Sequence, residues 1–448
     1  MEKDLKTHNL TEIKKKYPTF CILPFTQIGS SNDGNYRICC VSEEIQDGGI
    51  LKPTGTPYNM RTDSVDTVWN TQFYKQLRSD MLNGIQNSAC EYCWNYENSG
   101  AYSKRMKNID ERIYMYNYQE YIDIAIENDN QMPLPSDLDI RVGTLCNLKC
   151  ITCYPGASSL HYDELTEMQA KSMQPPSLHQ IHFIDKLKQF NIDPDQFNPK
   201  NIDPAEILSN LEPSLKLAKH MSIVGGEPLV NKTTMRLLEY CVEQGYSKNM
   251  MLQIITNMSV INNKIIDLLL NFDFPMLCVS WDHVDEAKFN YIRYPLEYRV
   301  FRENFSTISQ YSKIQKKLST TWSIFNIFDF EAVFDEWERV AQSFSDDFVI
   351  NHGLVYYPNY FSLRYLEPEQ KQEIVTRTNE YLNKNRDFKI FKTNLEMVQS
   401  LQSIGDYMGT QYSDHHLVCQ ERTRVLKQYD ILRNSNYREL FPYIKDYE

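Results

Sequence analysis

The sequence predicts an α/β fold made of a small cysteine-rich α+β module, a region of six strand–helix units and a helical C-terminal tail. Apolar runs of strand length alternate with helical stretches in the middle of the chain, as in parallel α/β proteins. Most of the eleven cysteines lie before or at the start of that region. Past it, only helical periodicity remains. The predicted parts are an arm, the module, a helical connector, the strand–helix region with one insertion, and the tail: 1–18, 19–105, 106–135, 136–360 (insertion about 157–215) and 361–448.

Size and composition indicate a globular protein of two or three domains. The 448 residues are 42% hydrophobic and 24% charged, and no apolar run approaches the ~20 residues of a membrane span. The N-terminus has no apolar signal region, so we expect a cytoplasmic protein whose cysteines bind metal and do not form disulfides. A net charge of -12 disfavours a nucleic-acid partner, because a phosphate backbone requires a positive face, and no membrane partner is expected.

The module is expected to begin with a hairpin. Asp33-Gly34 lies between two apolar segments, so Cys21 and Cys39 would face each other across a two-stranded ribbon. Cys40 is an alternative to Cys39. Neighbours on a strand point to opposite faces, and only one of these two is therefore expected to bind.

A second cysteine pair follows a helical stretch in the module. Cys90 and Cys93 form the motif Cys-Glu-Tyr-Cys and bring the module to four thiolates, which is enough to saturate a metal centre. An iron–sulfur cluster and a structural zinc ion both accept four thiolates, so both alternatives stay open.

Six strand signals recur after the boundary at Pro133-Leu-Pro135. The expected strands are 137–143, 220–224, 251–256, 276–280, 319–327 and 348–355. The expected helices between them are 231–244, 262–271, 300–317 and 331–344. In barrel enzymes, the loops at the carboxyl ends of the parallel strands carry the catalytic residues.

The first of these loops carries Cys146, Cys150 and Cys153, spaced by three residues and then by two. Three thiolates on a four-iron cluster leave one iron open for an outside ligand. A structural zinc ion would need a fourth ligand, and none lies nearby in the sequence. The spacing therefore favours a [4Fe–4S] cluster with one open coordination site.

This loop resembles the CxxxCxxC motif of the radical S-adenosylmethionine (radical SAM) superfamily, position for position. The end of the second strand carries the superfamily's Gly-Gly-Glu-Pro motif, in which two glycines let backbone approach a ligand and a carboxylate follows. The resemblance implies an incomplete TIM-type barrel, a partial (β/α)6 fold. It also implies a [4Fe–4S] cluster on the three cysteines that binds S-adenosylmethionine (SAM).

The resemblance further implies contacts with SAM at polar residues that end the strands. Thr152 stands where most relatives have an aromatic residue against the adenine, so Tyr154 or a residue elsewhere is expected to replace it. Asn326 is a further candidate. Any of these polar residues could instead cap a helix. The residues assigned to SAM are Gly225, Gly226, Glu227, Pro228, Thr256, Asn257, Ser280, Asp282, Arg293 and Tyr154.

The N-terminal module resembles the twitch and SPASM domains of radical SAM enzymes. Cys21, twelve residues, Gly34, four residues and Cys39 fit the first half of their pattern. No further cysteines directly follow Cys93, so the likeness is to the shorter twitch form. It implies one auxiliary [4Fe–4S] cluster on Cys21, Cys39, Cys90 and Cys93. The module precedes the core here, whereas family members usually carry it after the core.

The remaining segments carry weaker signals. The insertion at 157–215 has the composition of turns between short helices and is interpreted as a substrate-shaping lid or a plain long loop. In the tail, Asp414-His415-His416 with Cys419 is interpreted as a helix start with Asp414 as N-cap in preference to a metal site.

The resemblance implies a radical SAM oxidoreductase or maturase. It would cleave SAM reductively to a 5′-deoxyadenosyl radical and abstract hydrogen from a peptide or protein side chain, with the auxiliary cluster accepting an electron. A flavodoxin- or ferredoxin-type reductant is expected. The alternatives are the same chemistry on a small molecule, such as a sugar or aminocyclitol alcohol, and a zinc-stabilised non-catalytic binding protein.

Overall fold

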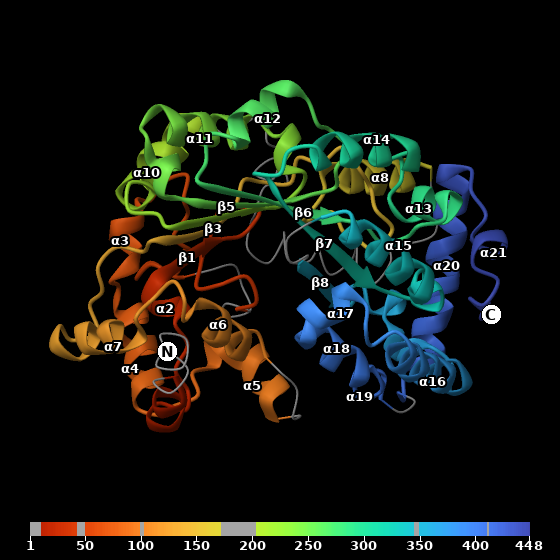
Figure 1. Ribbon diagram of the computed structural model, residues 1–448, viewed down its shortest axis with the longest axis horizontal. Helices are drawn as coiled ribbons and strands as arrows, with labels where there is room; N and C mark the ends of the chain where they lie inside the picture. Colours follow the sequence, from red (N-terminus) through yellow and green to blue (C-terminus); the bar gives the residue numbers. More distant parts are fainter. Residues whose placement is uncertain (1–9, 43–49, 99–102, 172–202, 345–348, 410–411) are drawn as a thin grey trace. The chain divides into compact units, whose positions relative to one another are not determined.

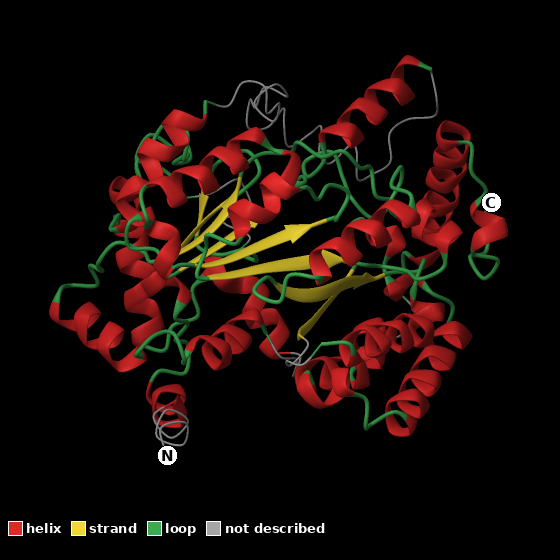
Figure 2. Ribbon diagram, turned by 45° about the horizontal axis from the view of Figure 1, so that its top comes forward, coloured by secondary structure: helices red, strands yellow, loops and turns green. Residues whose placement is uncertain are grey.

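The strands of the protein form one open, mostly parallel sheet. The computed structural model describes residues 10–42, 50–98, 103–171, 203–344, 349–409 and 412–448. Eight strands occur in the order β2 (Tyr36–Arg37), β1 (Gln27–Ser30), β3 (Asp137–Arg141), β4 (His220–Val224), β5 (Met251–Thr256), β6 (Phe274–Ser280), β7 (Gln315–Trp322), β8 (Val349–Leu354). Figure 2 colours the strands yellow. Because β2 and β8 are the edges, the sheet is not closed into a barrel. The predicted α/β class is confirmed, and the sheet is consistent with a partial TIM-type fold.

The described residues divide into two compact units. Those within 1–143, 195–253 and 268–274 form the first unit. Those within 144–194, 254–267 and 275–448 form the second unit. Each unit is described by itself below. Part of the predicted insertion, residues 172–202, lies outside the described residues.

All six predicted strands are present. They are β3 (Asp137–Arg141), β4 (His220–Val224), β5 (Met251–Thr256), β6 (Phe274–Ser280), β7 (Gln315–Trp322) and β8 (Val349–Leu354). β6, β7 and β8, labelled in Figure 1, pair in parallel. In their register Ser280 lies opposite Ser319, and Ser319 lies opposite Asn351.

The prediction was wrong for one helix and the strand after it. Helix α14 (Tyr298–Ser309) ends eight residues before the expected limit of 317, and β7 starts at Gln315. Buried and more exposed residues alternate along β7, but its buried positions include Lys316 and Thr320. These polar residues conceal the alternation of apolar and polar positions, so the pattern predicts no strand before residue 319.

Helices follow the strands as the sequence predicted. Those of the strand–helix region are α10 (Pro204–Leu215), α11 (Lys232–Glu243), α12 (Asn263–Leu269), α13 (Glu286–Ile292), α14 and α15 (Phe330–Gln342). Asn231 caps α11, since its Oδ1 accepts from the backbone N–H of Thr233 at 2.9 Å. Its Nδ2 donates to the carbonyl of Val142 at 2.6 Å. This side chain therefore ties the start of α11 to the segment that follows β3.

The N-terminal hairpin belongs to the main sheet. β1 (Gln27–Ser30) is buried along its whole length and pairs in parallel with β3, while β2 (Tyr36–Arg37) pairs antiparallel with β1. The expectation that Cys21 and Cys39 face each other across the ribbon is wrong. Cys21 lies before helix α2 (Leu23–Thr26), where Pro24 favours a helical turn, and Cys39 follows β2.

The first unit contains further helices before β3, and one of them carries a buried arginine. They are α3 (Val65–Trp69), α4 (Gln72–Leu82), α5 (Glu91–Asn98), α6 (Lys104–Arg112) and α7 (Tyr118–Glu127). Arg78 of α4 is fully buried and donates to the carbonyls of Pro24 and Trp69 at 2.8 and 2.9 Å. Its guanidinium lies 4.5 Å from the Trp69 ring centroid. These bonds satisfy a charge that would otherwise destabilise the unit.

The tail is helical, as predicted. Its helices are α16 (Pro368–Lys384), α17 (Lys389–Thr393), α18 (Leu395–Gln402), α19 (Ile404–Met408), α20 (His415–Arg433) and α21 (Tyr437–Leu440). Asp414 occupies the N-cap position of α20, but its side chain accepts from the Tyr365 hydroxyl at 3.2 Å and caps nothing. In the described parts of the chain, we find no helix with the length and apolar character that a membrane crossing requires.

A buried histidine makes the stability of the first unit depend on pH. His220 Nδ1 donates to Asp137 at 2.8 Å, and Arg112 pairs with the same carboxylate. Burial, with the nearby charge of Arg112, lowers the pKa of His220 from 6.5 to about 3. As pH falls below 6.5, His220 binds a proton in the unfolded chain but not in the folded chain. The free energy of unfolding therefore decreases.

We therefore expect acid sensitivity that His220→Asn reduces. The unfavourable contribution of His220 should reach about 2 kcal/mol at pH 5. Urea unfolding of wild type and variant between pH 7 and pH 5 measures it. Parallel pH profiles for the two proteins would contradict the assignment.

Candidate active site

The loop that carries Cys146, Cys150 and Cys153 belongs to the second unit and is held by hydrogen bonds along its backbone. The N–H groups of Lys149 and Ile151 donate to the carbonyls of Tyr294 and Ile292, each at 2.8 Å. Further bonds come from the start of helix α8 (Ser159–Ala170) and the residue before it. Ser158 Oγ donates to the Leu148 carbonyl at 2.7 Å, and His161 Nε2 to the Cys150 carbonyl at 2.7 Å.

N–H donors lie near two of the three sulfurs. Cys146 Sγ accepts from the Leu148 backbone at 3.4 Å and lies 3.9 Å from Asn257 Nδ2. Cys150 Sγ lies 3.9 Å from Arg293 Nη1. Hydrogen bonds to cluster-ligating sulfur are one of the factors that set the reduction potential of iron–sulfur proteins.

Burial favours the protonated form of two of these thiols, Cys150 and Cys153. It raises the pKa of Cys150, and it raises the pKa of Cys153 to about 12, where Cys150 adds to the effect. Thiols bind metal as thiolates, so loading this loop must release protons. The half-buried cysteines, their shared loop and the donors beside them fit an iron–sulfur cluster.

Two residues assigned to SAM from the sequence form an ion pair in this structure. Arg293 Nη2 lies 2.6 Å from Asp282 Oδ2. Asp282 Oδ1 in turn accepts from Thr320 Oγ1 at 3.2 Å and from the Thr321 backbone at 3.0 Å. Burial would lower the pKa of Arg293, but Asp282 and Cys150 raise it above its ordinary value. The guanidinium is therefore charged and fixed beside the cysteine loop.

Other predicted residues of the second unit lie around the same strand ends. Thr256 Oγ1 accepts from the Met258 backbone at 3.0 Å. Asn326 is fully buried and donates to the carbonyl of Asp282 at 3.1 Å, so it ties the ends of β6 and β7 together. Tyr154 meets Tyr357 edge-on, with ring centroids 6.1 Å apart. Ser280 is half-buried at the end of β6.

The Gly-Gly-Glu-Pro motif lies in the first unit, directly after β4. Gly225 and Gly226 adopt φ values of +95° and +48°, which side chains rarely adopt. A Cβ on Gly225 would lie 2.5 Å from Asn32 Oδ1 and 3.2 Å from the Gly143 carbonyl. Glu227 is buried, and its Oε1 accepts from the Leu229 backbone at 3.2 Å. The assignments of these residues to SAM remain predictions.

The four N-terminal cysteines are also brought together in the first unit. Cys21, Cys39, Cys90 and Cys93 line one cavity. Burial, with Cys93 nearby, raises the pKa of Cys21 to about 12. Cys39 and Cys40 lie after β2 and not on it, so the opposite-face argument does not apply; Cys39 is buried and lines the cavity, whereas Cys40 is half-buried.

These four thiols are not arranged around a single ion. Among the described residues, no three His, Cys, Asp or Glu side chains are close enough together to hold one metal ion. A four-iron cluster is larger than one ion, so its ligands stand farther apart. The same finding applies to His415 and Cys419, which lie 3.5 Å apart in the helical tail.

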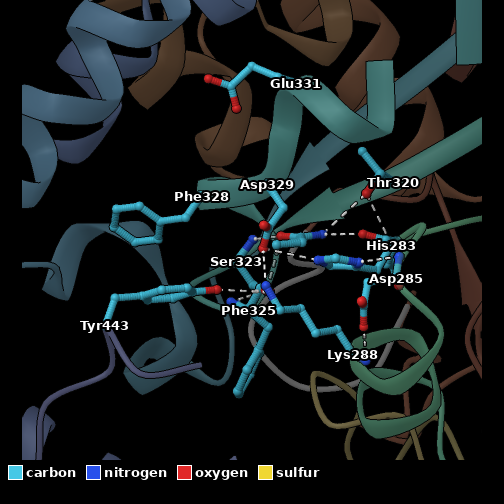
Figure 3. A network of polar contacts seen from close by, with 12 residues as sticks. His283, Asp285, Lys288, Thr320, Ser323, Phe325, Phe328, Asp329, Glu331 and Tyr443 are labelled. Carbon is cyan, nitrogen blue, oxygen red and sulfur yellow. Dashed lines mark hydrogen bonds and ion pairs between the residues drawn. The ribbon is translucent and has the colours of Figure 1, made fainter. Parts of the chain in front are cut away.

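A network that the sequence analysis missed lies beyond the ends of β6 and β7 (Figure 3). His283 is 1% exposed; its Nε2 donates to Asp329 Oδ2 at 3.1 Å, and its Nδ1 accepts from the Asp285 backbone at 2.9 Å. Lys288 Nζ donates to the same Asp329 oxygen at 2.7 Å. Burial would raise the pKa of Asp329, but His283 and Lys288 lower it to about 2. Only His283, adjacent to Asp282 after a strand, carried a usable sequence signal.

Gly225→Ala tests the close packing at the Gly-Gly-Glu-Pro motif. Gly245→Ala is the matched control, because Gly245 has φ +77° and no atom within 4 Å of an added Cβ. Both changes impose a positive φ on alanine, but only the first also meets Asn32. We expect Gly225→Ala to lower the free energy of unfolding by about 1–3 kcal/mol more than the control. Equal losses in urea unfolding would contradict the packing described above.

Comparison with known proteins relates this chain to one superfamily. Residues 140–316 match the model of the Radical SAM superfamily. Similar solved structures include anSMEcpe with bound AdoMet, at 16% identity and a TM-score of 0.36, covering 54% of this chain and 60% of that one. Streptococcus suis SuiB bound to S-adenosylmethionine is 14% identical, with a TM-score of 0.33 and coverage of 70% and 62%.

A structure of Streptococcus suis SuiB bound to precursor peptide SuiA is 13% identical, with a TM-score of 0.37 and coverage of 71% of this chain and 68% of that one. The chain thus spans 60% and 62% of the lengths of the first two structures. No curated protein matches it. The match over residues 140–316, which contain both the cysteine loop and the Gly-Gly-Glu-Pro motif, identifies this segment as a radical SAM domain.

Proposed function

We propose that this protein is a radical SAM oxidoreductase or maturase acting on a peptide or protein side chain. The observation that carries the proposal is the three-cysteine loop, whose backbone is fixed and whose sulfurs lie beside N–H donors, within a radical SAM domain. Cys146, Cys150 and Cys153 would hold a [4Fe–4S] cluster, which would supply the electron for reductive cleavage of SAM; the 5′-deoxyadenosyl radical formed with methionine would abstract a substrate hydrogen. The proposed reductant is a flavodoxin- or ferredoxin-type protein.

The residues of the chain hold and orient the cofactors. Cys146, Cys150 and Cys153 would bind the cluster and leave one iron open for SAM. Arg293 supports this arrangement, because its Nε is buried and has no hydrogen-bond partner among the described residues. That N–H is available to a carboxylate such as that of SAM. Glu227, which is buried, would accept a hydrogen bond from the SAM amino group.

The shared cavity of Cys21, Cys39, Cys90 and Cys93 supports an auxiliary [4Fe–4S] cluster. Arg105 lines this cavity and is held by Glu97, with Nε to Oε1 at 2.9 Å. A cluster bound to four thiolates carries negative charge, which the Arg105 guanidinium would partly offset. With all its irons ligated by protein, this cluster would accept an electron from the substrate radical.

SAM cleavage tests the proposed function. Reconstituted protein reduced by dithionite should convert SAM to 5′-deoxyadenosine, measured by liquid chromatography. The formation of 5′-deoxyadenosine should fall to background in a triple variant with Cys146→Ala, Cys150→Ala and Cys153→Ala. Cys241→Ala, which alters a buried cysteine of α11, should leave it intact. Formation that survives the triple change would contradict the proposal.

Metal analysis tests the auxiliary cluster. Wild type should bind about eight irons per chain, falling to about four when the four module cysteines become alanine. The matched variant lacking the three loop cysteines should also retain about four. Zinc in place of iron in the loop variant would identify the module as a structural zinc site.

A further inference from the structure

A buried ion pair joins the tail to the helix that follows the cysteine loop. Arg433 ends α20, and Glu164 lies in α8, 269 residues away in sequence. Arg433 Nε donates to Oε1 at 3.0 Å and Nη2 donates to Oε2 at 2.8 Å. Both side chains are 2% exposed. The geometry is bidentate, which fixes direction as well as distance.

Glu164 also contacts the loop itself. Lys149, between the first two cysteines, places Nζ 3.3 Å from Oε1 of Glu164. His161 Nδ1 lies 3.7 Å from the other carboxylate oxygen, while Nε2 donates to the Cys150 carbonyl. The carboxylate is therefore shared by two cations.

Arg433 also contacts Tyr294, whose carbonyl binds the loop backbone. Its guanidinium lies 4.3 Å from the Tyr429 ring centroid and 5.2 Å from that of Tyr294. The Tyr294 carbonyl accepts from the Lys149 backbone at 2.8 Å. Arg433 thus contacts both Glu164 and the segment that binds the loop backbone.

Stability alone does not account for this arrangement. A buried ion pair is weak evidence for stabilisation, because desolvation of both charges offsets their attraction. Glu164 with Arg433 and Lys149 carries a net charge of one positive unit beside the loop. Positive charge near an iron–sulfur cluster favours its reduced form, which carries one more electron.

We propose that Arg433 is a positioning residue for the cluster loop: it holds Lys149 through Glu164, packs on Tyr294, whose carbonyl binds the loop backbone, and its charge raises the reduction potential of the cluster. This inference rests on the proposed function. Helix α20 of the tail would then contribute, through Arg433, to the reduction potential of the cluster. Removing either charge should loosen the loop, but the two removals should move the potential in opposite directions.

The test compares Arg433→Met, Glu164→Gln and Arg433→Lys in the reconstituted protein. Arg424→Met is the matched control, because Arg424 pairs with Glu421 within the same helix at 2.7 Å. EPR-monitored redox titration gives the midpoint potential of the loop cluster, and metal analysis gives iron per chain. Thermal unfolding of the metal-free proteins reports stability separately.

We expect Arg433→Met to lower the potential and Glu164→Gln to raise it, both with less iron bound than wild type. Arg433→Lys should restore the potential, and Arg424→Met should change neither quantity. Unchanged potentials, or shifts of the same sign, in Arg433→Met and Glu164→Gln would overturn the inference even where thermal stability falls. A wild-type protein that binds no iron would contradict the proposed function. If wild type binds the expected iron but the variants keep its midpoint potential and iron content, only the present inference is overturned.

Discussion

The second unit depends on a constraint at the cysteine loop, where the buried backbone polar groups must all find partners. Residues 146–153 of this loop form neither a helix nor a strand. Its backbone bonds therefore go to its surroundings: to Tyr294 and Ile292 on one side, and to Ser158 and His161 at the start of α8 on the other. The backbone from Leu148 to Ile151 is thus fixed by groups outside the motif, whereas the Cys153 N–H bonds to the Cys150 carbonyl within it.

The same requirement extends to the charges beside the loop. Arg293 is held by Asp282, and Asp282 is held by Thr320 and the Thr321 backbone. Asp282 is buried, Arg293 is half-buried, and the two charges pair with each other, which is the condition under which charges persist inside a protein. Fixed charges and N–H donors near sulfur are the means by which a protein adjusts a bound cluster.

The sequence predicted the fold and the site best where the signal is local. Three cysteines within eight residues, and a motif directly after a strand, can be recognised without knowing the fold. The Glu164–Arg433 pair could not be predicted, because its partners are 269 residues apart and each is an ordinary charged residue on a helix. β1 was predicted as part of a separate module, since its pairing with β3 depends on a contact across more than a hundred residues. The limits of α14 and β7 were missed because buried Lys316 and Thr320 conceal the strand pattern.

The measurement that tests the central claim most directly is EPR spectroscopy of the reduced, reconstituted protein with and without SAM. If SAM binds the open iron of the loop cluster, its addition should change the line shape of the reduced cluster in wild type. The change should be absent when Cys146, Cys150 and Cys153 are all alanine. A wild-type spectrum that SAM leaves unaltered, or a SAM-dependent change that persists without the three cysteines, would contradict the account.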